Sequence, residues 1–556
     1  MSDSHAQPLT RRRFLTGAAA GAGAIILAPQ TAALGLTSTK PAGLYRGGRF
    51  AEGVIAGDPS ASGVTLWTRL DGVEGAGRVE LEIATDKGFR KVVQRTAIAT
   101  SAKIDHAVKA RVAKLKPYEE YYYRFATKTA ESHVGRFRTA PPAGSKQPVS
   151  FAFFSCQDYT HGYYNAHEVL AKGDYDFVVC LGDYIYAETY HAVGTDKNGL
   201  KTGVRNDPIG KAGPNKDIVR EALTLEDYRD KYKLYRSDKS LQKVHAKFPM
   251  VMLWDDHEVQ DNYAGKPADG GLPPVKRFSA KRKKAAYQAF FESMPAFAGA
   301  KGDRLYRSLT FGDTVELIVM DQRRYRADQP CGDGVAPACA DYNQPRDFLG
   351  RTQMDWVKQR LAASKATWKI LANEVTIMPT KVLGDSYYGF DSWPGYPQER
   401  AELLTHIQSK AIKDVVFVTG DIHTFITGDV RVAEDSKTAA DSVAVEFVAG
   451  SITSQGLGET DLDAGGGVTI PGNDANPSTP SAIIDALRGV NPWVDQADFD
   501  HHGFGAIKAS GTGLHCELVR LQTIKKKSTA VLPSATFTYD LKPGQTSVKG
   551  VHGPAA

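Results

Sequence analysis

Cysteine is scarce in this chain, with five among 556 residues. So few cysteines exclude a small fold held together by a disulfide framework. Cys331 and Cys339 enclose a short Gly/Pro/Ala-rich loop, PCGDGVAPACAD, which an oxidising compartment would close with a disulfide. Cys180 and Cys516 lie inside apolar runs and are predicted to be core residues. Cys156 differs from them, because it ends the apolar run FAFFSC directly before polar residues.

A long apolar run is also missing. The apolar stretch at 18–28, AAAGAGAIILA, is far shorter than the ~20 residues that a membrane-spanning helix needs. It follows TRRRFLT, where Arg11 and Arg12 stand together, and this order is typical of a twin-arginine export signal. We therefore assign residues 1–47 to a signal region. The protein is expected to be secreted by the twin-arginine export machinery. This machinery exports proteins that are already folded, often with a cofactor bound, so the signal is also a hint of a metal site.

Neither sign of charge dominates: 69 Lys and Arg stand against 63 Asp and Glu, which gives a formal net charge of +6. No basic run or repeat marks a nucleic-acid surface, and the KKK at 525–527 is interpreted as a solvated turn. We therefore expect no nucleic acid as a partner. With 42% hydrophobic and 24% charged residues, the composition is that of a globular protein large enough for two domains.

The first part of the chain has no convincing helical pattern. Residues 48–140 contain short alternating segments separated by turn signals, which favour a small all-β sandwich; they are VTLWTRL, RVELEIAT, HAVKARVAKL and EYYYRFAT. PPAGSKQP at 141–148 is interpreted as a linker. The rest divides into a catalytic domain at 148–525 and a C-terminal strand and tail at 526–556.

The second part alternates apolar strands with helical stretches near 165–172 and 352–363. Its strands are continuous apolar runs, which is typical of strands buried on both faces of a layered α/β sheet; they are FAFFSC, DFVVCLGD, VMLWDD, VELIVMD, WKILANE, DVVFVTGD and VAVEFVAG. The predicted fold class is thus α/β, a layered sandwich preceded by the small β-sandwich domain. Several strands end in an acidic or polar residue.

These strand ends carry the candidate site, because open α/β sheets place their chemistry at the carboxyl ends of strands. The residues are Cys156, Asp183, Tyr186, Asp255, Asp256, His257, Glu258, Asn262, Asp421 and His423. Taken singly, each acidic residue could be an ordinary helix cap or turn residue, and Cys156 could be an ordinary core cysteine. Taken together, anionic groups at one edge of a sheet repel one another unless a cation is present, so the pattern predicts a metal site.

At these residues the chain resembles a known family. The segments LWTR, FFSCQDY, LGDYIYAE, LWDDHEVQDN, MDQRRYR, GYPQER, GDIHTF and FDHHGF follow, in order, the pattern of PhoD-type alkaline phosphatases. These are extracellular calcineurin-like metallophosphoesterases related to the purple acid phosphatases. The resemblance runs from about residue 50 to about residue 525. In length and export signal the chain is also similar to the secreted calcium-dependent phospholipase D enzymes of that family in streptomycetes.

The resemblance implies a metallophosphoesterase sandwich with Fe³⁺ beside Ca²⁺. Iron would be bound by Cys156, Asp183, Tyr186 and Asp421, while Asp183 bridges to calcium and Asn262 and His423 complete the calcium side. Asp255, Asp256 and Asp500 are further candidates for a second calcium or for support around the ligands. Ligand chemistry agrees, since thiolates select iron, copper or zinc whereas hard oxygen ligands suit calcium.

The implied reaction is attack of a metal-bound hydroxide on phosphorus, without a covalent enzyme intermediate. His257 or His502 would orient the phosphate or protonate the leaving group, and Arg323 or Arg324 would clamp the ester; a structural polar role is the alternative for each. The leading substrate hypothesis is phospholipase D action that releases choline from phosphatidylcholine and leaves phosphatidate. Under this hypothesis the protein touches a membrane surface transiently through exposed aromatic side chains. The candidates are Tyr159, Tyr163, Tyr164, Tyr387, Tyr388 and Trp393. The alternatives are a PhoD-like alkaline phosphatase that acts on phosphomonoesters and diesters, and a binding protein without activity.

Overall fold

The structure is a computed structural model. It describes residues 43–194, 203–214, 218–265, 279–296, 304–332, 334–459, 481–533 and 537–551, and the short strands β1 (Ile25–Leu27), β24 (Leu462–Asp463) and β25 (Thr469–Ile470). Arg11 and Arg12 of the expected export signal lie outside these residues. In the described part of the chain, no helix is both long enough and apolar enough to cross a membrane.

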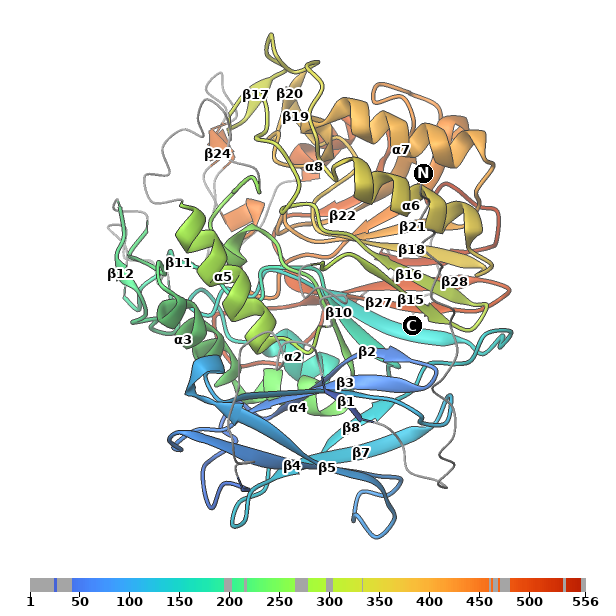
Figure 1. Cartoon of the computed structure of the whole chain (residues 1–556). Helices are drawn as coiled ribbons and strands as arrows, with labels where there is room; N and C mark the ends of the chain where they lie inside the picture. Colours follow the sequence, from blue (N-terminus) through green and yellow to red (C-terminus); the bar gives the residue numbers. More distant parts are fainter. Residues whose placement is uncertain are drawn as a thin grey trace, which may run out of the picture.

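Two large sheets dominate the structure (Figure 1), and the first of them also takes in strands from the first part of the chain. The first has the order β1, β6 (Ala107–Val112), β3 (Gly63–Arg69), β2 (Val54–Ser60), β14 (Met250–Met252), β10 (Phe177–Cys180), β9 (Val149–Phe154), β27 (His502–Ala509), β28 (Leu514–Leu521) and β29 (Thr538–Leu541). The second has the order β15 (Arg307–Phe311), β16 (Val315–Val319), β18 (Trp368–Asn373), β21 (Val415–Thr419), β23 (Ser442–Val448), β22 (Phe425–Arg431) and β26 (Val494–Asp498).

The sheets pack face to face because their apolar strands are buried on both sides. Along β9, Phe151 and Phe153 enter the core between the sheets, while Ala152 and Phe154 enter the core on the outer face. That outer face is covered by α2 (Asn165–Leu170), α3 (Leu225–Arg236), α4 (Lys239–Lys247) and α5 (Ala280–Ser293). The outer face of the second sheet is covered by α6 (Arg351–Ala363), α7 (Pro397–Ser409) and α8 (Ser481–Val490). The layers are therefore helix, sheet, sheet and helix, which confirms the predicted layered α/β class.

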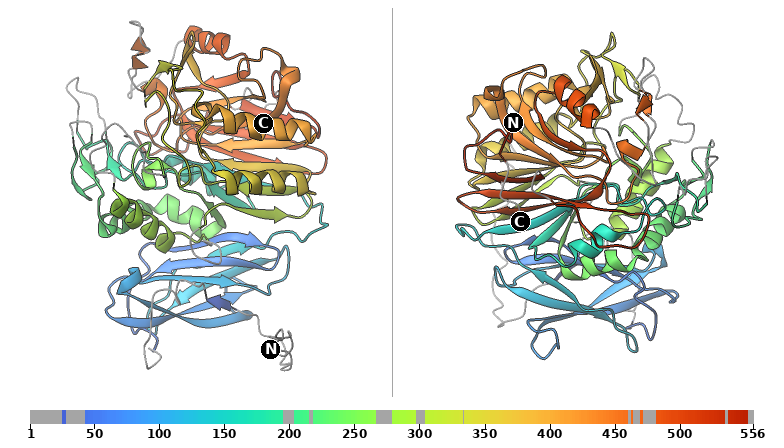
Figure 2. Two further views of the ribbon diagram at one scale, coloured as in Figure 1. Left: turned by 45° about the horizontal axis from the view of Figure 1, so that its top comes forward. Right: turned by 180° about the vertical axis from the view of Figure 1, so that it is seen from behind.

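The first part of the chain forms the expected small β-sandwich (Figure 2). A four-stranded sheet of β5 (Val92–Ser101), β4 (Ala76–Ala84), β7 (Glu120–Ala126) and β8 (Gly135–Arg138) packs on β2, β3 and β6 around a common core. Alternation is regular in β7, where every second residue is buried. The sandwich also joins the large sheet, since β2 pairs in parallel with β14 at Gly57 and Met250.

The parallel strands decide where the site lies. β9, β10 and β14 run parallel to one another in the first sheet, as do β16, β18, β21 and β23 in the second. Their carboxyl ends therefore meet at one edge of the double sheet. The predicted helices near 165–172 and 352–363 are present as α2 and α6.

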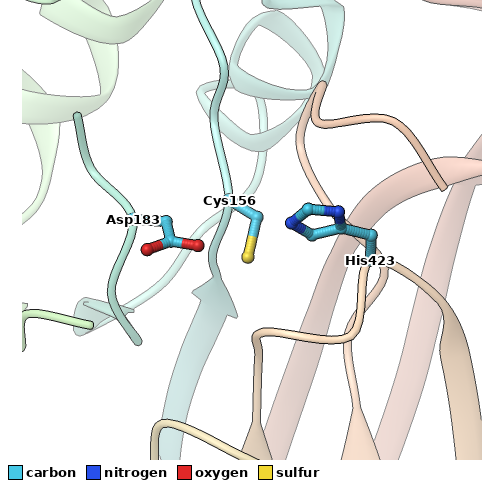
Figure 3. Close-up of side chains that lie close together, drawn as sticks. All are labelled: Cys156, Asp183 and His423. Atoms are coloured by element: carbon cyan, nitrogen blue, oxygen red, sulfur yellow. The ribbon is translucent and has the colours of Figure 1, made fainter. Parts of the chain in front are cut away.

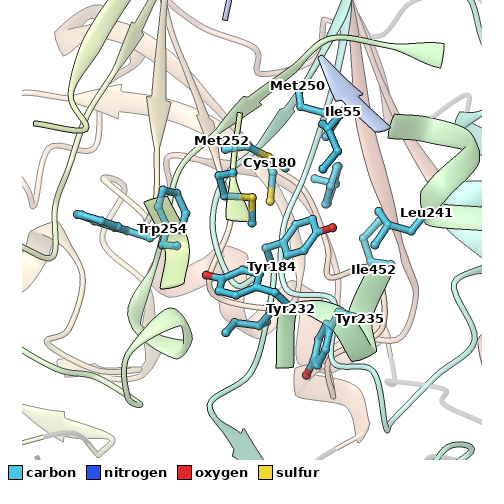
Figure 4. Packing of buried hydrophobic residues seen from close by; sticks show 14 of the residues in the cluster. Ile55, Cys180, Tyr184, Tyr232, Tyr235, Leu241, Met250, Met252, Trp254 and Ile452 are labelled. Carbon is cyan, nitrogen blue, oxygen red and sulfur yellow. The ribbon is translucent and has the colours of Figure 1, made fainter. Parts of the chain in front are cut away.

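Sequence patterns did not indicate α3, which is polar overall. It is anchored by the buried tyrosines Tyr228, Tyr232 and Tyr235 and begins at a capping box between Thr224 and Asp227. These rings pack with Cys180, Met252 and Trp254 in the core beneath the first sheet (Figure 4).

The remaining elements are short. They are the strands β11 (Glu188–Thr189), β12 (Lys211–Ala212), β13 (Arg220–Glu221), β17 (Ala336–Pro337), β19 (Lys381–Leu383) and β20 (Ser386–Tyr387), and the 3₁₀ turns η1 (Ala102–Ile104), η2 (Asp256–Glu258), η3 (Trp393–Gly395), η4 (Ala439–Asp441) and η5 (Leu457–Glu459).

The cysteines lie where the sequence places them. Cys331 and Cys339 form a disulfide with Cα atoms 5.5 Å apart, and Cys180 and Cys516 are fully buried in two different cores. Because the disulfide closes a short loop, Cys331→Ser combined with Cys339→Ser is expected to lower the free energy of unfolding by about 2–3 kcal/mol, measured in urea. Neither residue contacts the strand-end site, so specific activity of the folded fraction should stay unchanged. A loss of activity at full folding would contradict this local role.

Candidate metal centre

Three of the predicted ligands converge between the two sheets (Figure 3). Cys156 follows β9, Asp183 follows β10, and His423 lies between β21 and β22. Their ligand atoms all lie within 4.8 Å of one another. A thiol, a carboxylate and an imidazole at this spacing can share one cation.

Tyr186 adds a phenol to this group. Its hydroxyl is 3.2 Å from Asp183 Oδ2 and 3.0 Å from His423 Nε2, and it accepts a hydrogen bond of 2.6 Å from the Ser454 hydroxyl. The other ring nitrogen of His423 is 2.8 Å from the carbonyl oxygen of Gln455, which orients the ring. The loop after β23 therefore holds two of the candidate ligands in place.

A second group of carboxylates surrounds Arg323, which is fully buried. Asp255, Asp256 and Asp421 have ligand oxygens within 4.8 Å of one another. Arg323 pairs with all three of them and also with Asp391, whose Oδ2 is 2.6 Å from Nη1. One guanidinium thus faces four carboxylates.

A third group, formed by Asp183, Asp256 and His257, joins the first two, since it shares one residue with each. The backbone N–H of His257 donates to Asp183 Oδ1 at 3.3 Å, and its ring stacks on Tyr186 with centroids 4.1 Å apart. Asn262 donates its backbone N–H to Asp256 at 2.7 Å. The three groups therefore form one continuous cluster of candidate metal ligands.

The backbone at the site is unusual. Cys156, Asp183, Asn262, Asp421 and His423 all have positive φ, between 51° and 66°. For residues other than glycine this left-handed conformation costs on the order of 1–3 kcal/mol each and persists only where the surroundings impose it. Such outliers gather at functional sites, and five of them here coincide with predicted ligands.

The electrostatics of the site favour a bound cation. Burial raises the pKa of Asp183, of Asp421 and of the Cys156 thiol well above their ordinary values, and the neighbouring carboxylates add to this rise. Burial raises the pKa of Asp255 to about 7 despite Arg323. Asp255 Oδ2 is also buried without a hydrogen-bond partner among the described residues. A bound cation would hold these groups in their anionic forms and supply the missing partner.

Two family models match the chain. The model described as PhoD-like phosphatase matches residues 151–518, and that of the PhoD-like phosphatase N-terminal domain matches residues 38–141. The chain belongs to the PhoD-like phosphatase family. Alkaline phosphatase D of Bacillus subtilis (strain 168) is 37% identical over 465 residues, which cover 81% of this chain and 77% of the relative.

Solved structures agree with this assignment. A structure described as that of PhoD matches with a TM-score of 0.78 and 31% identity, over 92% of this chain and 93% of the other. The purple acid phosphatase PPD1 from yellow lupin matches with a TM-score of 0.52 and 12% identity, over 88% and 73% of the two chains, which shows a shared fold. This PhoD-like protein is therefore an α/β phosphoric ester hydrolase, and the alternative of a binding protein without activity is excluded.

The donors suit the metals that the family resemblance implies. A thiol, a phenol and an imidazole are ligands for iron, while the carboxylates around Asp256 are hard ligands of the kind that calcium prefers. The geometry groups His423 with Cys156 and Asp183, and Asp421 with Asp255 and Asp256. Asp500 is not among the metal-competent groups of the described residues; its backbone N–H donates to Asp498.

The candidate catalytic residues differ in their surroundings. His257 Nδ1 is 2.9 Å from Glu188, and Nε2 lies 3.8 Å from Asp256 and 3.9 Å from Asp261. Burial lowers the pKa of His257, but Asp256, Asp183 and Glu188 outweigh it and raise this pKa well above its usual value.

The other candidates are His502, Arg323 and Arg324. His502 is buried between Ser451, at 2.8 Å, and Glu459, at 3.2 Å. Arg323 is engaged by carboxylates, whereas Arg324 is half-buried with its guanidinium over the Tyr287 ring.

The expectation of exposed aromatics is wrong for three residues. Tyr164, Tyr387 and Trp393 are buried, because their rings pack in the cores and the polar atoms of Tyr164 and Trp393 have internal partners, Gln157 O and Asn373 Oδ1. Tyr159, Tyr163 and Tyr388 are half-buried. The face of the Tyr159 ring is already occupied by the Arg205 guanidinium, 3.9 Å from its centroid.

Sequence reasoning missed several residues that arrange the site. Glu188 orients His257, Asp391 pairs with Arg323, and Ser454 contacts Tyr186. Glu258, which the sequence grouped with the strand ends, accepts backbone hydrogen bonds from Asp183, Tyr184 and Asp255 and so ties β10 to β14. Two of them had a signal: Glu188 ends the segment LGDYIYAE, and Ser454 follows the apolar strand VAVEFVAG within a few residues.

Proposed function

We propose that the protein is a secreted phosphodiesterase with a mixed iron and calcium centre, and that its preferred substrates are phospholipids with a cationic head group. Iron is assigned to Cys156, Asp183, Tyr186 and His423, because their ligand atoms lie together. Calcium is assigned to the oxygen ligands of Asp183, Asp255, Asp256 and Asp421, with Asn262 beside Asp256. When bound, such ions supply Lewis-acid stabilisation of phosphate oxygens and a water of lowered pKa.

The chain's own residues provide the proton for the leaving group. Glu188 accepts from His257 Nδ1–H, which fixes the ring, and its negative charge favours the imidazolium form. The Nε2–H then points to the space beside Asp256 and Asp261, where it can protonate the departing alcohol. In this proposal Arg323 does not touch the ester. It holds four carboxylates in position, because all four of its partners are protein side chains.

The observation that carries the substrate proposal is the surroundings of Asp261. Its side chain is 50% exposed and lies beside the proton-donating nitrogen of His257. The Tyr190 ring meets His257 edge-on with centroids 5.7 Å apart. A half-exposed carboxylate beside the proton-donating nitrogen, with an aromatic ring against the same histidine, suits a departing cationic alcohol such as choline.

A second candidate is the activity in the relative's name, alkaline phosphatase, acting on phosphomonoesters and diesters. The two are separated by comparing kcat/KM for phosphatidylcholine micelles, a phosphodiester whose leaving alcohol is uncharged and a small phosphomonoester. We expect choline release with phosphatidate as the other product to be the fastest reaction. A large preference for the monoester would instead favour the phosphatase.

Asp261→Asn tests the role of this carboxylate. It is expected to lower kcat/KM for phosphatidylcholine about fivefold, the effect of losing a partly exposed charge pair of about 1 kcal/mol, and to leave kcat/KM for the diester with an uncharged leaving alcohol unchanged. Asp385→Asn is the matched control, because that side chain is 96% exposed and outside the site. Equal losses on both diesters would argue against recognition of the cationic alcohol.

A further inference from the structure

A buried arginine, Arg282, lies in the first turn of α5, where its backbone N–H donates to the N-cap residue Ser279 at 3.1 Å. Its side chain lies between two buried carboxylates, Glu188 on β11 and Glu221 on β13, which face each other across the antiparallel pair of strands. Like charges directly opposite on neighbouring strands repel each other. Arg282 Nη2 donates to Glu188 Oε1 at 3.2 Å and Nη1 donates to Glu221 Oε1, so one guanidinium holds the pair together.

The same guanidinium reaches the segment that follows His257. Nη1 also donates to Gln260 Oε1 at 2.8 Å, and Nε donates to the Tyr228 hydroxyl at 2.8 Å. That hydroxyl donates in turn to the carbonyl oxygen of Val259 at 2.6 Å. Because η2 carries His257 and ends at Val259, the guanidinium fixes this turn as well as strand β11.

Glu188 uses its two carboxylate oxygens differently. Oε2 is 2.9 Å from His257 Nδ1, whereas Oε1 accepts from Arg282 and, at 3.4 Å, from the backbone N–H of Asp261. The terminal torsion of a glutamate has only broad minima, so the partners of the carboxylate decide how it is turned. Arg282 is the cationic partner at Oε1 and thereby keeps Oε2 directed at the histidine.

Helix α5 is itself held at its other end by the β-sandwich. Lys109 of β6 donates to the carbonyl oxygen of Phe291, and the Trp67 indole of β3 donates to that of Glu292 at 2.7 Å. These carbonyls lie in the last turn of the helix, where C=O groups have no partner within the helix. The sandwich therefore anchors the helix that presents Arg282.

We propose that Arg282 is a positioning residue, which acts through Glu188 to hold His257 in the orientation that delivers its Nε2 proton. This inference rests on the proposed role of His257 as the proton donor. A planar guanidinium suits the position, because its fork serves several acceptors at once, whereas an ammonium is a point charge. The competing role is purely structural, an ion pair that only stabilises β11, β13 and α5.

The two roles differ in their effect on proton transfer, which is measured with two esters of the same phosphate class, one with a nitrophenyl and one with an alkyl leaving group. A nitrophenolate departs without a proton, whereas an alkoxide needs one. Arg282→Gln is expected to lower kcat for the alkyl ester about 10–100-fold, part of the roughly 10²–10⁴-fold that general acid catalysis supplies, and kcat for the nitrophenyl ester less than about threefold. The content of bound metal should stay that of wild type.

Arg282→Lys is the conservative variant and carries the test where Arg282→Gln does not fold. It keeps the positive charge but not the fork, so it should recover part of the alkyl-ester kcat. Its remaining loss should again be confined to the alkyl ester.

Glu188→Gln tests whether Arg282 acts through this carboxylate. It should give the same selective loss, and adding Arg282→Gln should lower the alkyl-ester kcat less than about twofold further, because the two residues act as one unit. Arg400→Gln is the matched control. Arg400 is also buried, but it donates to three backbone carbonyl oxygens outside the candidate metal centre, so its loss should lower stability without changing the ratio of the two kcat values.

His257→Asn separates this inference from the role on which it rests. Equal losses on both esters would show that His257 is not the proton donor, and both proposals would fall. If His257→Asn affected only the alkyl ester, while the Arg282 variants affected both esters equally or neither, His257 would remain the donor and the positioning role of Arg282 would be overturned.

Discussion

Cys156→Ser is expected to remove the bound iron and to lower kcat for phosphate-ester hydrolysis by more than about 100-fold. Replacing partners around metal ligands typically costs about 10–100-fold, and loss of a ligand should exceed that. Serine is close to cysteine in size and has a hydroxyl donor where Cys156 has the thiol that donates to Ser155, so the change is mainly one of metal-ligand chemistry. The measurements are metal content, the visible charge-transfer band expected of ferric thiolate or phenolate, and kcat before and after removal of calcium by a chelator.

Cys516→Ser is the matched control, because Cys516 is equally buried but lies on β28 in the core between the sheets. It should lower stability by about 1–3 kcal/mol through burial of a hydroxyl, while iron and specific activity remain. Zinc as the sole metal, with full activity after calcium is chelated, would refute the assignment of iron and calcium. Full iron content in Cys156→Ser would refute the role of the thiol.

Arg323→Met should be the most destabilising single change near the site. It leaves Asp255, Asp256, Asp391 and Asp421 around an uncharged side chain, and removing one partner of a buried ion pair costs about 3–5 kcal/mol. The free energy of unfolding in urea is the direct measurement. Arg323→Lys should recover part of the loss, because an ammonium keeps the charge but not the fork that reaches several carboxylates.

Arg324→Met is the neighbouring control. Arg324 is half-buried with its guanidinium over the Tyr287 ring, so its loss should cost less than the loss of the fully buried Arg323. If Arg323→Met were as stable as wild type but unable to bind substrate, Arg323 would act on the ester, as the sequence suggested, and not on the carboxylates.

The strand ends could be read from the sequence because buried parallel strands are continuous apolar runs that stop abruptly. FAFFSC, DFVVCLGD and DVVFVTGD therefore showed where Cys156, Asp183 and Asp421 leave their strands. The order of strands, and hence the neighbour of each ligand, was not available from local patterns. His423 lies beside Cys156 only because the two sheets pack face to face.

Other parts of the site have no local signature. Asp391 lies in an irregular loop, and its pairing with Arg323 and Arg326 depends on contacts over more than 60 residues of sequence. Trp393 and Tyr387 looked like surface aromatics because they stand among turn residues, yet the loop folds back and buries them. Aromatic content alone does not distinguish a binding surface from a loop with its own small core.

The left-handed backbone of the ligand positions has a consequence for protein design. A designer who copied Cys156, Asp183, Asn262, Asp421 and His423 as side chains onto another α/β scaffold would place them on backbones that point them elsewhere. What has to be transplanted is the set of turns that end the strands, together with the groups that hold those turns, such as Glu258 across β10 and β14. In such a graft, the metal affinity would depend more on the turn conformation than on the choice of ligands.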